Sequence, residues 1–137
     1  MTITDGLYID AVIVKGSSRT FGVSINQRNE ENTDFEPMDL SDYAIRFSVL
    51  GSPVADGRVL VEHIITTNTT DEEGGCINNP TNGEFTFTIT SQDTNNLGLG
   101  KFPIKIEILD GASLEVEHVL TEGNENGEFN AIRIVEV

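Results

Sequence analysis

The chain has 137 residues, with 23 acidic residues against 8 Lys and Arg, so its formal net charge at pH 7 is −15. This length supports one domain, residues 1–137, that can bury a core without a disulfide or a metal. The negative charge repels nucleic-acid phosphates and anionic lipid headgroups, which argues against nucleic acid or a membrane as the main partner. No apolar run reaches the roughly 18 residues of a transmembrane helix. The beginning of the chain lacks the pattern of a secretory signal, so we expect synthesis in a cytoplasm.

The first half of the chain predicts strands separated by turns. β-Branched residues predominate in the segment 7–14, and Phe21, Val23 and Ile25 alternate with other residues in the segment 19–25. Period-two alternation is typical of a strand with one buried face. The other elements expected here are an exposed acidic loop at 26–37, a strand through Ile45, Phe47 and Val49, a turn at 51–57 and an apolar strand at 58–67.

The second half contains the clearest turn and strand signals. Asn82-Gly83 precedes Phe85, Phe87 and Ile89, which alternate with polar residues, so we predict a tight hairpin and a half-buried strand. The other elements expected here are an exposed loop at 68–82 with a short pairing around Cys76 and Ile77, a helical turn near 91–97, an alternating strand through Phe102, Ile104, Ile106 and Ile108, and strands at 114–121 and 129–137. About eight strands at this spacing favour an all-β sandwich.

Histidine and cysteine offer little evidence of a reactive or metal-binding site. His63 and His118 are the two histidines, and each lies within a predicted strand beside a Glu. That position is typical of a surface imidazole, whereas a zinc site would bring both together with a carboxylate. Cys76 is the single cysteine, and its Gly-rich acidic surroundings lack the positive charge that stabilises a thiolate. We expect no metal site and no catalytic thiol.

The acidic residues leave a few alternatives open. Asp71, Glu72 and Glu73, together with Asn78 or Asn79, offer oxygen ligands for calcium, but they lack the order of an EF-hand loop. Paired carboxylates could serve glycoside hydrolysis, although the chain has no Trp and only two Tyr to hold a sugar. No nucleophile elbow, phosphate loop or dinucleotide fingerprint is present. We therefore expect a protein that is not an enzyme and that needs no cofactor.

The order of several motifs resembles tailed-phage immunoglobulin-like domains, above all the N-terminal domain of baseplate upper proteins and related small virion proteins. The motifs that carry this resemblance are Phe21-x-Val23-x-Ile25, Asp39-Leu40-Ser41-x-Tyr43-x-Ile45-x-Phe47, Gly83-x-Phe85-x-Phe87-x-Ile89-Thr90, Asp93-x-x-x-Leu97, Gly100-Lys101-Phe102-x-Ile104-x-Ile106 and Gly127-Glu128-Phe129. The resemblance implies a single immunoglobulin-like antiparallel β-sandwich of about 7–8 strands. Family members often carry a C-terminal extension for receptor binding. This chain stops at Val137, so by this resemblance we expect it to correspond to the docking domain alone.

We expect a structural component of a tailed-phage virion, in the tail or baseplate, that is present in multiple symmetric copies. A capsid decoration protein is the first alternative, followed by a carbohydrate-binding module and then by a calcium-dependent enzyme or hydrolase fragment. Docking to other virion proteins would use the acidic loops, an edge strand and the two terminal segments, because unpaired backbone groups at an edge invite a further strand. The terminal residues that we expect to take part are Thr2, Ile3, Leu7, Ile9, Ile132, Ile134, Val135 and Val137.

Overall fold

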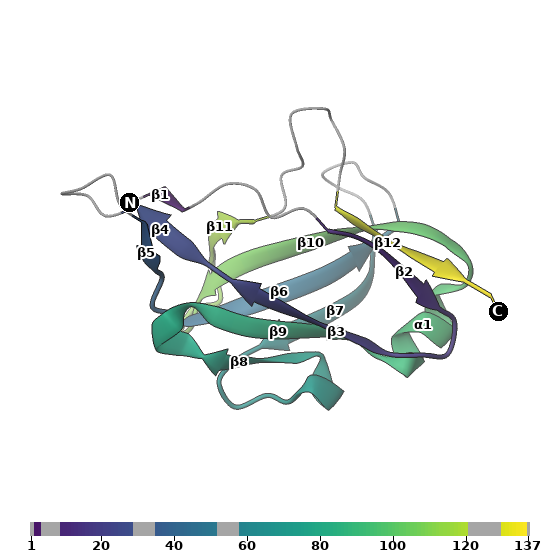
Figure 1. The fold of residues 1–137 in the computed structure, drawn as a ribbon, viewed down its shortest axis with the longest axis horizontal. Helices are drawn as coiled ribbons and strands as arrows, with labels where there is room; N and C mark the ends of the chain where they lie inside the picture. The colour runs from purple at the N-terminus through teal and green to yellow at the C-terminus, as the bar shows by residue number, and fades with distance from the viewer. Residues whose placement is uncertain (1, 4–8, 29–34, 52–57, 121–129, 137) are drawn as a thin grey trace.

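The computed structural model describes residues 2–3, 9–28, 35–51, 58–120 and 130–136, and these residues are mostly β (Figure 1). No helix in this part of the chain is long and apolar enough to cross a membrane. The strands are β1 (Thr2–Ile3), β2 (Asp10–Val14), β3 (Arg19–Ser24), β4 (Asn26–Arg28), β5 (Phe35–Pro37), β6 (Tyr43–Leu50), β7 (Val59–Ile65), β8 (Gly75–Asn79), β9 (Glu84–Ile89), β10 (Gly100–Asp110), β11 (Val116–Val119) and β12 (Ala131–Val135). The helical elements are α1 (Ser91–Leu97) and two 3-10 turns, η1 (Asp71–Glu73) and η2 (Pro80–Asn82).

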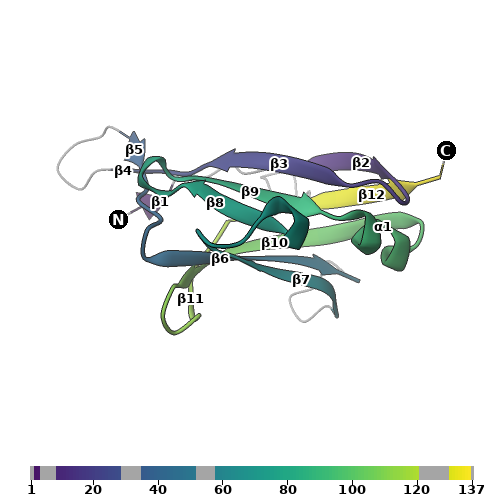
Figure 2. The same ribbon diagram turned by 90° about the horizontal axis from the view of Figure 1, so that it is seen from below.

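The described strands form three sheets. The large sheet has the order β2-β12-β10-β6-β7, and β11 also pairs with β10. The second sheet, β3-β9-β8, packs over it, and Figure 2 shows β3 and β9 in one layer with β6 and β7 in the other. The small sheet β1-β4-β5 lies at one end of the molecule (Figure 1). β2 and β12 run parallel, and the other described pairs are antiparallel. The predicted all-β character is thus confirmed.

The core lies between the large sheet and the second sheet, where the alternating apolar residues of both sheets meet. Phe47, Phe85 and Phe87 are each at most 1% exposed. Phe87 stacks on Phe47 and on Phe21, with ring centroids 4.8 Å apart in both pairs. Offset aromatic pairs of this kind add to the stability that burial supplies. The inward faces predicted for β9 and β10 are confirmed, since Ile89, Ile104, Ile106 and Ile108 are also buried.

The predicted hairpin before β9 is present, and Gly83 shows why glycine is needed there. The turn η2 joins β8 to β9, and Asn79 pairs with Glu84 across it. Gly83 has a φ of +70°, and a Cβ at this position would lie 2.4 Å from the carbonyl oxygen of Ile25. A side chain would therefore collide with backbone as well as strain the turn.

The segment 68–82 differs from the exposed loop that its polar composition predicts. It contains η1, β8 and η2, and the short pairing expected around Cys76 is confirmed by the pairing of Cys76 with Thr86. Ile77 anchors β8 because its side chain is buried in the core, 2% exposed. One buried isoleucine and a row of backbone hydrogen bonds thus outweigh the hydrophilic neighbours.

The segment 26–37 also begins and ends in strands, where the sequence predicts an acidic loop throughout. The Ile25 amide donates to Gly83, and the Met38 amide donates to the Ile25 carbonyl. These bonds bring the two ends of the segment together, so that β4 and β5 pair. Residues 29–34 lie outside the described residues.

The strands expected at 114–121 and 129–137 are shorter in the structure than in the prediction. Leu114 precedes β11 and has a φ of +60°, and its amide donates to the Asp110 carbonyl. It therefore belongs to the turn between β10 and β11. At the end of the chain, β12 covers Ala131–Val135, and residues 121–129 and 137 lie outside the described residues.

Candidate docking faces

The outer surface of the large sheet is the first candidate, and alternation along β2 and β12 determines which side chains it presents. On β2, Ala11 and Ile13 are buried, so Val12 and Val14 point to the other side and are exposed. On β12, Ile132 and Ile134 are buried, which places Arg133 on the same outer surface as Val12. The register of the parallel pair sets Val12 beside Arg133.

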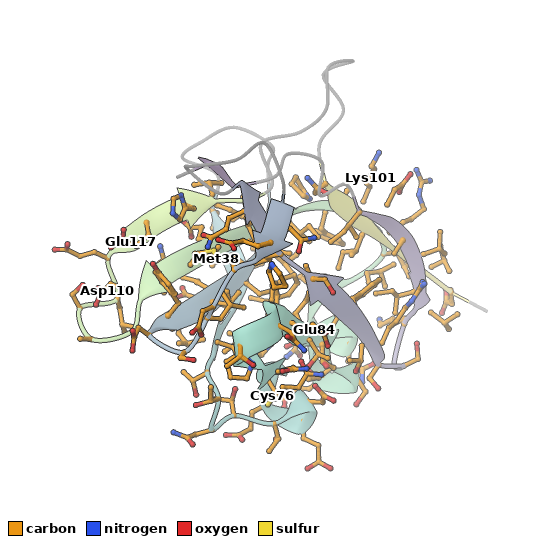
Figure 3. The ribbon with its side chains drawn as sticks, turned by 60° about the vertical axis from the view of Figure 1, so that its left-hand side comes forward. Met38, Cys76, Glu84, Lys101, Asp110 and Glu117 are labelled. Atoms are coloured by element: carbon orange, nitrogen blue, oxygen red, sulfur yellow. The ribbon has the colours of Figure 1, made fainter. Side chains whose placement is uncertain are left out.

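The neighbouring strand β10 brings further basic residues to this surface. Lys101 pairs with Arg133, and Lys105 follows four residues later on the same side of β10. Lys101 and Arg133 are exposed, and Figure 3 shows Lys101 at this margin of the sheet. Asp10 on β2 is an exposed acidic residue among them. We call this surface the basic face and define it by Val12, Val14, Lys101, Lys105, Arg133 and Val135.

Glu107 balances the charges at the inner border of the basic face. It is only 4% exposed, and its carboxylate accepts a 2.9 Å hydrogen bond from Arg46 Nε. This bond is the main cause that raises the pKa of Arg46 above its ordinary value. Lys105 Nζ lies 3.5 Å from the other oxygen of Glu107. Arg46 and Lys105 thus share one buried carboxylate.

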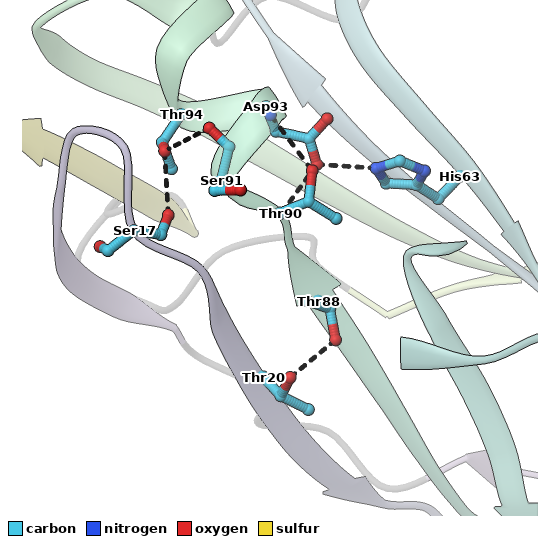
Figure 4. A network of polar contacts seen from close by, with 8 residues as sticks. All are labelled: Ser17, Thr20, His63, Thr88, Thr90, Ser91, Asp93 and Thr94. Atoms are coloured by element: carbon cyan, nitrogen blue, oxygen red, sulfur yellow. Dashed lines mark hydrogen bonds and ion pairs between the residues drawn. The ribbon is translucent and has the colours of Figure 1, made fainter. Parts of the chain in front are cut away.

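The outer surface of the second sheet has a different chemistry. Phe85, Phe87 and Ile89 point inward from β9, so the residues between them point outward. Thr88 meets Thr20 of β3 there, with 2.8 Å between their hydroxyl oxygens (Figure 4). We call this surface the threonine face and define it by Thr20, Ser24, Glu84, Thr86 and Thr88.

Carboxylates of η1 border the threonine face. The Thr86 hydroxyl donates to Asp71, and Glu73 accepts a hydrogen bond from the Thr70 amide, which closes a capping box. Glu72 is exposed beside them. The structure describes every residue of η1 and of the segment from β8 through β9. These residues include four carboxylates and no Lys or Arg. The border of this face is therefore strongly negative.

The calcium site considered from the sequence has no counterpart in the described residues. Asp71 and Glu73 use their carboxylates in the bonds to Thr86 and Thr70. Among the residues that the structure describes, no group of three His, Cys, Asp or Glu side chains could hold a metal ion. Cys76 is half-buried, and its amide donates to the Thr86 hydroxyl, so it belongs to the pairing of β8 with β9.

His63 makes a polar contact that its position beside a Glu does not predict. Its Nε2 lies 2.8 Å from Asp93 Oδ2, where the ring N–H donates to the carboxylate (Figure 4). Asp93 also accepts from the Thr90 amide, and its own amide donates to the Thr90 hydroxyl, which caps α1. Burial raises the pKa of the Asp93 carboxyl, but the bonds from His63 and Thr90 outweigh burial, so its pKa lies below the usual value. This carboxyl therefore stays ionised and ties α1 to β7.

Two surface hollows lie among the described residues. One of about 570 Å³ is lined by Tyr43, Thr66 and Asp110, among others, at the end of β6 and β10. The amides of Ser113 and Ala112 lower the pKa of Asp110, which keeps it an anion rather than an acid catalyst. The other hollow, of about 360 Å³, lies on the threonine face between Thr20, Asp71 and Thr90. Side chains with hydroxyl, amide or carboxylate groups line both hollows.

The structure places the C-terminal residues expected to dock in two different environments. Ile132 and Ile134 are buried in the core, and β12 is paired on both sides, with β10 and with β2. The expectation of an open edge at the end of the chain is therefore wrong for β12, because parallel pairing with β2 covers that edge. Val135 is half-buried on the basic face.

The N-terminal group is held by its own chain. Ile9 is half-buried, its amide donates to the Asn130 side chain, and its carbonyl accepts from Ala131. Thr2 and Ile3 form β1, which pairs with β4. Leu7 and Val137 lie outside the described residues.

The basic face itself was not predicted from the sequence. A signal for it exists in the alternation of basic and apolar residues along β10 and β12, but only the register of the strands shows that these residues are neighbours. No protein-family model matches the chain, and no curated protein matches it either.

Proposed function

We propose that this protein is a non-enzymatic structural component of a tailed-phage virion, in the tail or baseplate, that docks onto neighbouring virion proteins. The proposal joins the resemblance of the sequence motifs to two features of the structure. These are the order of the strands and the chemistry of the outer face of the large sheet.

The strand order supports an immunoglobulin-like sandwich. In chain order, β3, β6, β7, β8, β9, β10 and β12 correspond to strands B, C, C′, D, E, F and G of a variable-type immunoglobulin domain. The sheet β12-β10-β6-β7 then has the order G-F-C-C′, and β3-β9-β8 has the order B-E-D. The first strand departs from the usual ABED sheet, because β2 pairs with β12 in the opposite sheet. Such a fold serves many functions, so the fold alone does not carry the proposal.

The single observation that carries a docking role is the basic face. Val12 is 56% exposed beside Arg133, which has Lys101 on its other side, in a protein whose net charge is −15. Exposed apolar side chains next to a cluster of basic residues, in a protein that is otherwise acidic, are typical of a surface that binds a partner. The described hollows, by contrast, do not bring a nucleophile together with a base.

A particle experiment tests the proposal. Particles made by cells that carry the gene are banded on a density gradient, and their proteins are quantified by mass spectrometry. We expect this chain at a fixed ratio to the major tail and capsid proteins. Disruption of the particles and separation of tails from heads should leave it with the tails, whereas recovery with the heads would support the decoration alternative. Its absence from banded particles would refute a virion role.

A charge reversal connects the particle experiment to the basic face. The change Arg133→Glu removes an exposed cation without touching the core, so the variant should fold normally. We expect its incorporation into particles to fall by about tenfold, which corresponds to about 1.4 kcal/mol of binding energy. Arg58→Glu makes the same exchange at an exposed residue just before β7, at the opposite edge of the large sheet from β2, and serves as the matched control. Equal incorporation of Arg133→Glu and wild type would contradict docking through this face.

A further inference from the structure

We infer that the basic face of one copy binds the threonine face and the η1 carboxylates of a second copy, head to tail. The inference rests on the proposed docking role and deepens it, because it names the partner of the same face.

The two faces have complementary charge. Lys101, Lys105 and Arg133 give the basic face three cations beside the anions Asp10 and Glu107, and the Glu107 carboxylate lies 3.5 Å from Lys105 Nζ, which leaves Lys101 and Arg133 as its exposed cations. The other side of the molecule carries four carboxylates on β9 and η1, namely Asp71, Glu72, Glu73 and Glu84.

The one cation of the strands that form the threonine face is already engaged. Arg19, at the start of β3, places its guanidinium 4.8 Å from the ring centroid of Phe21. Its Nη1 also donates to the carbonyl oxygen of Val12 at 3.3 Å. These contacts direct Arg19 toward β2 and away from the carboxylates of η1. The threonine face thus offers negative charge to a partner.

The same charges disfavour a symmetric dimer. In an isologous contact each face meets its own copy, so Arg133 and Lys101 would approach the same cations of the partner. Two threonine faces would likewise oppose carboxylates to carboxylates. Like charges across an interface cost several kcal/mol, whereas the head-to-tail arrangement pairs opposite charges at every contact.

Apolar contact supplies the part of the binding energy that charge alone does not. Val12 and Val14 are 56% and 37% exposed, and they lie together on β2. Burying them against the methyl groups of Thr20 and Thr86 would remove apolar surface from water, at about 25 cal/mol per Å². The central part of the contact would then be apolar, with the ionic groups around it.

The net charge sets the conditions under which copies associate. A charge of −15 on each copy repels another copy at long range. At physiological ionic strength the Debye length is about 8 Å, so the repulsion is screened while direct ion pairs persist. We expect association to be weak in dilute solution and strong where other proteins hold copies side by side. Repetition of a head-to-tail contact builds a ring or an open row, which suits a part present in several symmetric copies.

Zero-length cross-linking tests the contact directly. Equal amounts of ¹⁴N-labelled and ¹⁵N-labelled protein are mixed at high concentration and treated with a water-soluble carbodiimide. We expect cross-linked peptides that join a light Lys101 to a heavy Glu84 or η1 carboxylate, and the reverse. Peptides of mixed isotope come only from two copies. Cross-links between copies that do not involve these two faces, or none at all, would overturn the inference.

Complementary variants test the direction of the contact. Arg133→Glu damages the basic face, and Glu84→Lys damages the threonine face. Each variant alone should self-associate about tenfold more weakly than wild type in sedimentation equilibrium. A mixture of the two should associate again, because Glu84→Lys keeps an intact basic face and Arg133→Glu keeps an intact threonine face. Arg58→Glu, at the opposite edge of the large sheet, should behave as wild type, and matching circular dichroism spectra should show that all variants fold. Failure of the mixture to associate would refute head-to-tail binding.

The two proposals fail in different ways. If the chain is present in particles but no cross-link joins two copies, its partner is another protein, and only the self-association is refuted. If copies cross-link as expected but the chain is absent from particles, the self-association stands and the virion role is refuted.

Discussion

Asp93 shows how a single residue can connect elements that are distant in the sequence. Its carboxylate accepts hydrogen bonds from the Thr90 amide and from His63, so it caps α1 and holds the helix against β7. His63 in turn lies parallel to Phe47 with ring centroids 6.4 Å apart, and a Cβ on Gly74 would come within 2.4 Å of its ring. The imidazole is therefore held in position on two sides, and the polar contact stabilises the structure rather than activating a nucleophile.

The change Asp93→Asn should lower the free energy of unfolding by about 1–2 kcal/mol near pH 7, because the amide bonds more weakly to His63 and to the helix terminus. The pKa of Asp93 is lower in the folded state than in the unfolded state. Its contribution is therefore fully present above the unfolded value of about 3.9 and is lost as the pH falls through the folded value. The difference between wild type and variant should shrink over that acidic range. Urea denaturation at several pH values measures it.

Asp42→Asn is a suitable control for this comparison, because it removes an exposed carboxylate of the same kind. It should change the stability by less than about 0.5 kcal/mol. A difference between wild type and Asp93→Asn that is constant from neutral pH to pH 3 would contradict the role given to the ionised carboxylate.

At the scale of an element, β12 combines a core face with a surface face. Ile132 and Ile134 fill the core, and Arg133 points to the basic face from the same strand. The strand is also paired with β2 on one side and β10 on the other. Removal of residues 132–137 would therefore unfold part of the domain, and loss of docking in such a truncation would say nothing about the docking surface.

Point changes separate the two faces of β12. Ile134→Ala should destabilise the protein by about 2–4 kcal/mol, because it leaves a cavity in a buried site. Val12→Ala, on the exposed side of the adjacent β2, should change the stability by no more than about 0.5 kcal/mol. Chemical denaturation measures both free energies. Equal effects of the two changes would mean that β12 is not packed as the structure has it.

At the scale of the whole molecule, the two sheets differ in the charges of their outer surfaces. The large sheet carries Lys101, Lys105 and Arg133 together with Asp10 and Glu107, whereas carboxylates without a nearby Lys or Arg of β8 or β9 border the second sheet. The acidic residues outnumber the basic ones by 15. Repulsion among them opposes folding as well as association, since the folded state brings the charges closer together than the unfolded chain does.

Raising the NaCl concentration from about 10 mM to about 150 mM should therefore increase the melting temperature by a few degrees, because salt screens the repulsion. Differential scanning calorimetry at constant pH near neutrality measures this change. An equal ionic strength of a second neutral salt, such as potassium chloride, should have the same effect. A fall in the melting temperature would show that attractive ion pairs, such as Arg46 with Glu107, dominate instead.

The local pattern of side chains was enough to predict most strands, the helical turn α1 and the inward face of each alternating segment. Phe87 and Ile106 point inward because a strand alternates its side chains whatever its neighbours are. The same reasoning found the short pairing around Cys76 and Ile77 but described the rest of 68–82 as an exposed loop, and it failed for β12, where it expected an open edge. Pairing is a contact between distant segments, and no local pattern encodes it.

The sequence by itself determined that this protein is mostly β, that it has one core, and that its charge is strongly negative. The tertiary structure alone decided that Arg133 lies beside Val12 and Lys101, that Asp93 meets His63, and that β2 closes the edge of β12. The physical reason is the range of the interactions. Alternation, turns and caps depend on residues a few positions apart, whereas register and sheet order depend on pairings that only the folded chain brings together.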